Sequence, residues 1–320
     1  MERITKWNKL AFFLLVLFAL FYPLICRFDN YMLHVGIIVS FAITMALSMW
    51  LIYTLGLISF AHAGFMGIGA YTSAILYTRL GWPLWIDFWL CGAIALVIAF
   101  IVGIPLMRTK AVYFFMASWA LGEVITRVFV YFRGFFGGWD GIFNINPPSF
   151  LSSRVAYYYV VILFAVVVVL LINKINNSRT GMIYWAIHES EILAQHVGIN
   201  VLKHKIICFC AGSVIAAMTG SLFAHYNTYI NPHEFGIWTS EFALVHIIVG
   251  GLNTVVGPIL GAGILTVVDE LLRPTEYFRV IIFGVVIIVT VIFFPGGLES
   301  LVSKLRNFFQ RSITRNNLNS

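Results

Sequence analysis

The sequence predicts an all-α, polytopic membrane protein with about ten transmembrane helices, some of them broken by glycine-rich segments. Of the 320 residues, 61% are hydrophobic and only 10% are charged, and the mean hydropathy is +0.93. The apolar residues fall in runs of about 20, the length that a helix needs to cross the hydrocarbon core of a bilayer. Charged residues are confined between these runs, so lipid is the expected solvent.

Residues 1–30 predict an N-terminal signal-anchor span. The basic residues Arg3, Lys6 and Lys9 precede an apolar run at 10–25. No small-residue cleavage site follows this run, so we expect the span to remain in the mature protein.

Nine further apolar stretches define a predicted transmembrane domain at 31–300. They lie at 31–54, 58–78, 84–106, 111–132, 155–173, 205–226, 236–252, 256–272 and 279–294. An unbroken helix over 234–272 would be about 58 Å long at about 1.5 Å per residue, against a hydrocarbon core of about 30 Å. We therefore expect a break at 250–253 (GGLN) and 257–258 (GP), which divides this region into two short spans.

The distribution of Lys and Arg predicts the orientation. With ten spans and a cytoplasmic N-terminus, 13 basic residues lie in inside segments and 6 in outside segments, and Arg127 lies inside a span. Cytoplasmic loops of membrane proteins carry such an excess of Lys and Arg. We therefore expect two cytoplasmic termini, a cytoplasmic loop at 174–204 and a basic cytoplasmic tail at 301–320. The net charge of +7 follows from this topology, so no nucleic-acid partner is expected.

The sequence carries no motif that predicts an enzyme. It has no GxxxxGK[ST] phosphate-binding loop, no HExxH motif and no nucleophile elbow. The four cysteines, Cys26, Cys91, Cys208 and Cys210, match neither a redox nor a zinc spacing. We expect no catalytic residue, no metal site and no cofactor bound by this chain. Energy for any active process must then come from a partner or an ion gradient.

The strongest local signal is LGLISFAHAGFMGIGAYTSAIL at 55–76, which concentrates small residues in one span. Small residues four apart let helix backbones approach closely. The same spacing recurs at Gly212, Ala216, Gly220 and Ala224. Glycines in lipid also permit an unwound turn, which is tolerated only where it is buried or lines a cavity. Packing alone, and packing combined with lining of a pathway, both remain open.

Several polar residues inside the spans are candidates for a pathway through the membrane. His62 either serves a function or holds two helices together by a polar bond. Glu123 and Arg127 lie four apart on one helix and can pair, either as an internal salt bridge or beside an aqueous cavity. The candidate pathway and broken-helix residues are Ser59, His62, Gly64, Gly67, Gly69, Glu123 and Asn253.

The segment GMIYWAIHESEILAQHVGIN at 181–200 predicts one short amphipathic helix at the cytoplasmic surface. Apolar residues recur at helical spacing over 182–197, and Gly198 offers a left-handed C-cap. Such a helix can lie on the membrane or dock in a groove of a cytoplasmic partner. Its polar face carries Glu and His rather than Lys and Arg, which favours a protein partner.

Two of these segments together resemble a known family. LGLISFAHAGFMGIGAYTSAIL resembles the glycine-rich helix of the LivH/LivM permeases of branched-chain amino acid ABC importers. GMIYWAIHESEILAQHVGINVLKHKIICFCAGSVIAAMTGSLFAHY resembles their cytoplasmic loop and the span that follows it. Further support comes from RTKAVYFFMASWALGEV at 108–124, GGWDGI at 137–142, NPHEF at 231–235, VGGLNTVVGPILGA at 249–262 and FPGGL at 294–298. The order and spacing resemble the LivM branch over 48–300.

The resemblance implies a permease subunit of the bacterial inner membrane that translocates branched-chain amino acids. The implied partners are a LivH-like second permease subunit, two cytoplasmic ATPases that bind ATP and Mg, a periplasmic substrate-binding protein and membrane lipid. The loop would couple to the ATPases through the residues at the family's matching positions, Gly181, Ala186, Glu189, Glu191, Ala194 and Gly198. The sequence departs from the family at His188, where the family usually has Arg.

Other functions remain open at the level of sequence. A urea or short-chain amide ABC permease would share these motifs. A stand-alone channel or an ion-coupled secondary transporter would need no ATPase, so neighbouring genes for ATPases and a binding protein would separate it from the ABC class. An integral-membrane enzyme is disfavoured by the lack of a catalytic constellation.

Overall fold

The computed structural model confirms the all-α membrane class. It describes residues 21–24, 29–148, 151–275, 277–293 and 296–300. The α-helices in this part of the chain are α2 (Asn30–Tyr53), α3 (His62–Leu80), α4 (Leu84–Leu106), α5 (Ala111–Tyr131), α6 (Arg133–Phe136), α7 (Arg154–Asn176), α8 (Arg179–Glu189), α9 (Glu191–His196), α10 (Val201–Asn227), α11 (Ile237–Gly250), α12 (Val256–Leu271) and α13 (Tyr277–Phe293). Short 3-10 helices lie at η1 (Gly138–Asp140), η3 (Pro232–Phe235) and η4 (Arg273–Thr275). The two-residue strands β1 (Ile142–Phe143) and β2 (Tyr229–Ile230) pair antiparallel.

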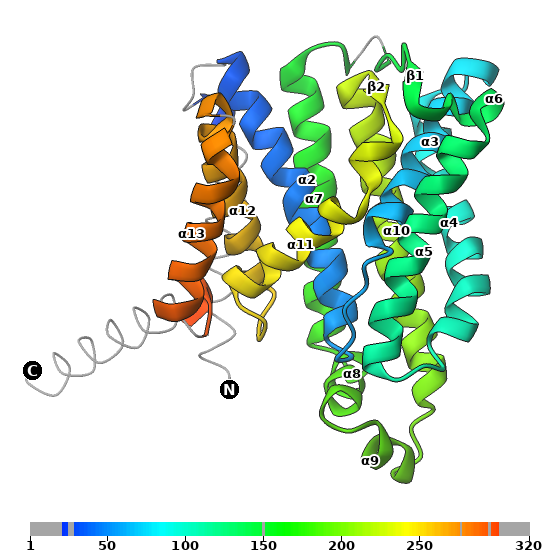
Figure 1. Ribbon diagram of the computed structural model, residues 1–320, viewed down its shortest axis with the longest axis vertical. Helices are drawn as coiled ribbons and strands as arrows, with labels where there is room; N and C mark the ends of the chain where they lie inside the picture. Colours follow the sequence, from blue (N-terminus) through cyan, green and yellow to red (C-terminus); the bar gives the residue numbers. More distant parts are fainter. Residues whose placement is uncertain (1–20, 25–28, 149–150, 276, 294–295, 301–320) are drawn as a thin grey trace, which may run out of the picture.

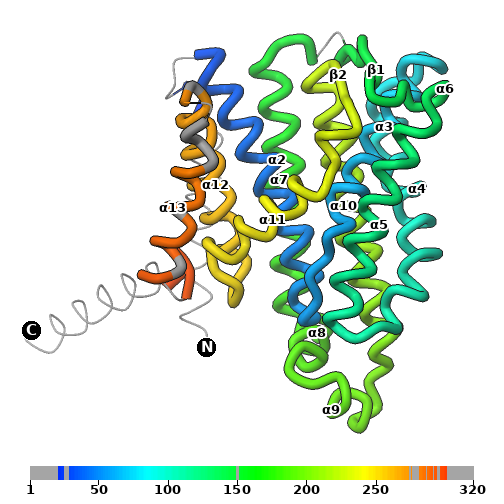
Figure 2. The backbone as a smooth tube through the Cα atoms, viewed as in Figure 1, coloured from blue at the N-terminus to red at the C-terminus, as the bar shows by residue number. Residues whose placement is uncertain are grey.

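The helices form one bundle with two distinct ends. Among the described residues, five helices (α2, α4, α5, α7 and α10) are long and apolar enough to cross a membrane. Figures 1 and 2 show β1 and β2 at one end, the β end, and α8 and α9 projecting beyond the other, the α8 end. Of the predicted first span, 10–25, only 21–24 belong to the described residues, and the tail at 301–320 lies outside them.

Small residues bring α3 and α10 into close contact. A Cβ atom at Gly220 would lie 1.9 Å from the carbonyl oxygen of Met66, and one at Gly69 would lie 1.9 Å from that of Ala217. A real Cβ atom cannot approach a backbone oxygen so closely. These two glycines therefore set the distance between α3 and α10, as small-residue packing in membranes requires.

Replacement of Gly220 by Ala is expected to lower the yield of folded protein several-fold, because the added methyl group forces α10 away from the backbone of α3. The measurement is the amount of monodisperse protein recovered after detergent extraction. Gly263→Ala is the matched control, since a Cβ atom there has nothing within 4 Å. Equal yields for the two variants would contradict this account of the α3–α10 contact.

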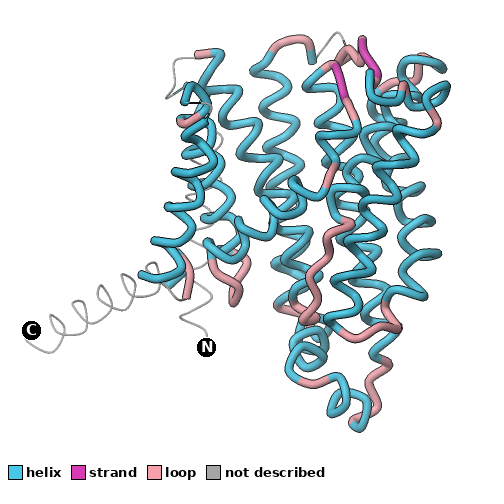
Figure 3. Tube along the Cα trace, in the orientation of Figure 1, coloured by secondary structure: helices cyan, strands magenta, loops and turns pink. Residues whose placement is uncertain are grey.

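The chain between α2 and α3 is not helical. α2 ends at Tyr53, and Gly56 has a φ of +75°, a value that glycine adopts without strain. α3 begins at His62, four residues later than predicted, near the middle of the bundle. Figure 3 shows the irregular segment 54–61 running back along the helices. This is the unwound stretch that the glycine-rich pattern allowed, and its buried polar groups need partners within the protein.

The second predicted break is also present. α11 ends at Gly250, α12 begins at Val256, and the loop 251–255 joins them. Gly251 has a φ of +121°. A Cβ atom at Gly257 would lie 2.1 Å from the oxygen of Gly251, so the loop folds back on the start of α12 too closely for a side chain.

The prediction of one continuous helix over 182–197 is wrong. The segment forms two helices, α8 and α9, which are separated by Ser190 in an extended conformation (φ −164°, ψ 111°). The Ser190 hydroxyl accepts a hydrogen bond from the backbone N–H of Leu193, so Ser190 caps α9 in place of continuing α8. Gly198 adopts the expected left-handed conformation, with a φ of +84°.

Candidate functional site

A partly open pocket of about 560 Å³ lies where the first irregular segment meets α5, η3 and α11. We call it the α5–α11 pocket. Its lining residues are Phe60, Phe115, Trp119, Glu123, Thr126, Arg127, Val130, Trp139, His233, Gly236, Ile237, Trp238 and Glu241. It combines charged groups of both signs with several aromatic rings.

Two serines hold the irregular backbone at the wall of this pocket. The backbone N–H of Phe60 donates to Ser118 Oγ of α5 at 3.1 Å. Ser240 Oγ of α11 donates to the Phe60 carbonyl oxygen at 2.8 Å and accepts from the Ala63 N–H at 2.9 Å. Because lipid offers no hydrogen bonds, these side chains satisfy backbone groups that helix geometry would otherwise satisfy. They fix Phe60 between α5 and α11.

Glu123 and Arg127 form the predicted pair, with Arg127 Nε 3.4 Å from Glu123 Oε2. Their side chains are 40% and 70% exposed on the isolated chain. Glu123 lies eight residues before the end of α5, a distance of about 12 Å along the helix axis. Exposure of two charges to hydrocarbon at that depth is costly. This face of α5 is therefore suited to contact with protein or water and not with lipid.

The other residues that line the α5–α11 pocket include further polar and aromatic side chains. His233 and Glu241 add two titratable side chains, and exposed rings of Trp119 and Trp238 stand beside them. A carboxylate can accept an ammonium group, a guanidinium can pair with a carboxylate, and aromatic faces can contact apolar groups. The arrangement is chemically suited to a small solute that carries both charges and an apolar part.

The other predicted pathway residues lie behind this pocket or away from it. His62 is fully buried, and its Nε2 lies 2.6 Å from Ser48 Oγ, which joins α3 to α2. Ser59 is also fully buried. Gly64, Gly67 and Gly69 pack against Ile125, Phe129 with Phe235, and Ala217, respectively. Asn253 is exposed in the loop 251–255.

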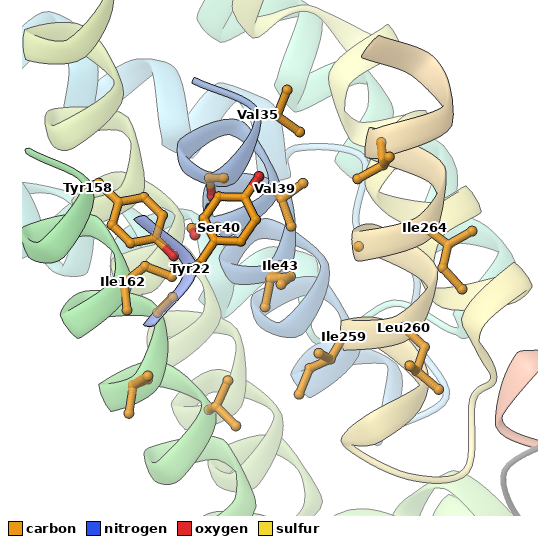
Figure 4. Close-up of a pocket in the computed structure, with 16 residues that line it drawn as sticks. Tyr22, Val35, Val39, Ser40, Ile43, Tyr158, Ile162, Ile259, Leu260 and Ile264 are labelled. Atoms are coloured by element: carbon orange, nitrogen blue, oxygen red, sulfur yellow. Dashed lines mark hydrogen bonds between the residues drawn. The ribbon is translucent and has the colours of Figure 1, made fainter. Parts of the chain in front are cut away.

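A second cavity, of about 340 Å³, lies between α2, α7 and α12 (Figure 4). Apart from Ser40 and the rings of Tyr22 and Tyr158, aliphatic residues line it, and none of its lining residues is charged. The Ser40 hydroxyl already donates to the Gly36 carbonyl oxygen at 2.7 Å. The cavity therefore suits hydrocarbon and offers no partner to a charged solute.

The loop residues at 181–198 divide into an inner and an outer set. Gly181 is buried where a Cβ atom would lie 2.3 Å from the Asn176 carbonyl oxygen, and Ala194 is also buried. Glu191 pairs with the buried Lys205 ammonium of α10. Ala186, Glu189 and Gly198 are exposed.

Exposed apolar side chains surround this outer set. Met182, Ile192, Leu193 and Val197 are each at least 65% exposed. Such a concentration of exposed apolar groups on a projecting segment is typical of a contact surface. Among the described residues, no group of three or more His, Cys, Asp or Glu could hold a metal ion.

Sequence reasoning identified Glu123 and Arg127 by their spacing but missed most of the α5–α11 pocket. Ser118 and Ser240 are single serines in apolar spans, and Phe60 and Trp238 resemble ordinary lipid-facing aromatics in the sequence. The signal in the sequence was that several spans each contain a polar residue. This signal does not show which of these polar residues lie close together.

The interrupted helices, the charged pocket at membrane depth and the projecting helical segment define a multi-pass membrane protein of the transporter class. A profile of the family described as "Branched-chain amino acid transport system / permease component" matches residues 31–291. The chain belongs to this family.

Curated relatives agree with this assignment. The chain is 25% identical over 270 residues to the high-affinity branched-chain amino acid transport system permease protein LivM of Salmonella typhimurium, covering 76% of this chain and 64% of the relative. It thus spans less than two thirds of that relative's length. It is 30% identical over 127 residues to LivH of the same organism (39% of this chain, 41% of LivH). It is 29% identical over 150 residues to the autoinducer 2 import permease LsrC of Yersinia pseudotuberculosis (44% and 42%). No solved structure matches the chain.

Proposed function

We propose that this chain is a permease subunit of an ABC importer that carries branched-chain amino acids across the bacterial inner membrane. The observation that carries the proposal is the exposed Glu123–Arg127 pair at membrane depth, beside the aromatic rings of the α5–α11 pocket. A branched-chain amino acid presents an ammonium, a carboxylate and an aliphatic side chain. The pocket offers a complement to each.

The same pair supports a second permease subunit as partner. An exposed ion pair is tolerated in a membrane when it faces a protein interface or a water-filled path. We propose that the α5–α11 face meets a LivH-like subunit and that the pocket forms one wall of the pathway between them. A periplasmic binding protein then delivers the substrate at the β end.

The α8 end is proposed to be cytoplasmic and to receive the ATPases, where ATP and Mg bind. The excess of Lys and Arg that the sequence places in the predicted inside segments, the loop 174–204 among them, supports the orientation, with both termini cytoplasmic. The exposed apolar side chains of α8 and α9, with Glu189 at their edge, support a docking surface for a protein partner.

Substrate choice is tested by uptake into proteoliposomes that hold the chain with the permease, ATPase and binding-protein products of its own operon. We expect ATP-dependent accumulation of leucine that unlabelled isoleucine and valine inhibit. Urea and acetamide are the controls for the alternative substrate class. Uptake of urea in place of leucine would reassign the substrate, and uptake that needs no ATPase would contradict the ABC class.

ATPase docking is tested with Glu189→Lys. Reversal of this exposed charge is expected to lower co-purification of the ATPase several-fold without affecting recovery of the permease, because the Glu189 side chain is exposed. The control is Lys174→Glu at the end of α7, outside the docking surface. Equal ATPase recovery for the two variants would contradict the proposed docking surface.

A further inference from the structure

Two aromatic side chains of α8 pack against the end of α2. The rings of Trp185 and His188 stack with their centroids 5.3 Å apart and an interplanar angle of 24°. The His188 ring also meets the Tyr53 ring edge-on at 5.2 Å. Trp185 is held in place by its indole N–H, which donates to Asn176 Oδ1 at 3.0 Å. The stack thus has a defined position between α8 and the last turn of α2.

His188 connects α8 to the first irregular segment. Its Nδ1 lies 3.1 Å from the carbonyl oxygen of Tyr53, and because a carbonyl oxygen only accepts, Nδ1 is the donor. A Cβ atom at Gly56 would lie 3.6 Å from the His188 ring, so the imidazole lies beside the turn that follows α2. That turn opens the segment 54–61, which ends beside Phe60 in the α5–α11 pocket.

Trp185 connects α8 to the second break. Its ring meets the ring of Trp50 edge-on, with centroids 6.4 Å apart. Trp50 is fully buried in α2, and its indole N–H donates to the Leu252 carbonyl oxygen at 2.9 Å. Leu252 belongs to the loop 251–255 at the end of α11, and the start of α11 lines the α5–α11 pocket.

We propose that Trp185 and His188 are positioning residues that transmit movement of α8 and α9 to both helix interruptions, the segment 54–61 that reaches the α5–α11 pocket and the loop 251–255 at the end of α11. The proposal rests on the proposed docking of ATPases on these helices. Packed aromatic rings and directed hydrogen bonds are stiff, so a shift of α8 displaces the Tyr53 carbonyl and, through Trp50, the Leu252 carbonyl. Segment 54–61 reaches the pocket at Phe60, and the loop 251–255 is connected to the pocket through α11, whose first residues line it.

His188 lies between Trp185, Tyr53 and Gly56. In this chain the ring occupies the inner face of α8, while Glu189 next to it is exposed. His188 on the inner face transmits the movement of α8, and the exposed Glu189 is available to contact the ATPase.

The test separates transmission from docking in the full complex with permeases, ATPases and binding protein. His188→Leu removes the donor at similar volume, whereas His188→Asn keeps an N–H donor near the Nδ1 position. We expect His188→Leu to lower the leucine transported per ATP hydrolysed by about five- to tenfold, a typical size for a coupling effect. The ATPases should remain bound, and His188→Asn should restore most of the ratio.

Trp50→Phe tests the second connection, since it keeps a ring but loses the donor to Leu252. We expect a fall in the same ratio, while Trp82→Phe, in the loop before α4, should leave it unchanged. A normal ratio in both His188→Leu and Trp50→Phe would overturn the proposal and leave the rings as packing alone. If ATPases fail to bind even the unmodified chain, the proposed function fails instead, so the two failures are distinguishable.

Discussion

Replacement of Glu191 by glutamine is expected to unfold the α8–α9 segment locally while leaving the bundle intact. The Lys205 side chain is only 2% exposed and pairs with Glu191, whose own side chain is 39% exposed. Removal of the carboxylate leaves the buried ammonium without its charge partner. Breaking a buried ion pair costs about 3–5 kcal/mol of stability. Because Glu191 is partly exposed, we expect a cost at the lower end of this range, about 3 kcal/mol.

The measurement is hydrogen–deuterium exchange of residues 179–200, where exchange should accelerate by about two orders of magnitude if the full cost is borne locally. Glu189→Gln is the matched control, because this neighbouring carboxylate is exposed and its loss should cost less than about 0.5 kcal/mol. Adding Lys205→Met to Glu191→Gln should restore protection, since methionine fills the buried volume without a charge. Unchanged exchange in Glu191→Gln would show that Lys205 finds another partner.

Charge reversal at Glu123 is expected to abolish most leucine uptake while the complex still assembles. A lysine at position 123 would lie beside Arg127. It would put a second positive charge where the Glu123 carboxylate is now. The loss of a hydrogen bond to a charged group costs about 1.5–3 kcal/mol. The rate of leucine uptake should therefore fall by about ten- to a hundredfold. The amount of ATPase bound to the complex should change much less.

The control for Glu123→Lys is Asp140→Lys. Asp140 also pairs with an arginine, at 2.5 Å from Arg133, but both side chains are well exposed in the connection between α5 and α7. Such a surface pair contributes about 0–1 kcal/mol, so its reversal should change uptake little. Equal uptake by Glu123→Lys and Asp140→Lys would place the substrate path elsewhere and contradict the role proposed for the α5–α11 pocket.

The break between α11 and α12 could be predicted and the unwound turn before α3 was left open, because the cause of both is local. Gly56 and Gly251 have positive φ values, and a Cβ atom at Gly257 would collide with backbone. Clusters of glycine record such requirements directly in the sequence. The division of the 181–200 segment into α8 and α9 was missed, because Ser190 fits either the polar face of one helix or the N-cap of a second. In the two-helix arrangement, Glu191 forms an ion pair with Lys205, which lies 14 residues further along the chain.

The pocket could be predicted only in part. Glu123 and Arg127 are neighbours on one helix, so their pairing follows from spacing alone. Phe60, in contrast, is held by Ser118 and Ser240, which are 58 and 180 residues away in the chain. Small-residue spacing indicated close packing, but it did not say that Gly220 meets Met66 and Gly69 meets Ala217.

The sequence by itself determined the solvent, the helical class, the family resemblance and the place of the break between α11 and α12. Each of these depends on composition or on residues within a few turns of one another, since apolar run length and backbone freedom are local properties. Only the tertiary structure decided that Glu123 faces a pocket while His62 is enclosed against Ser48. It also decided that His188 contacts the end of α2 and that Trp185 reaches the loop 251–255 through Trp50. These contacts depend on which helix faces pack together. Because the surfaces of membrane helices are almost uniformly apolar, the packing is set by contacts between residues that are far apart in the sequence.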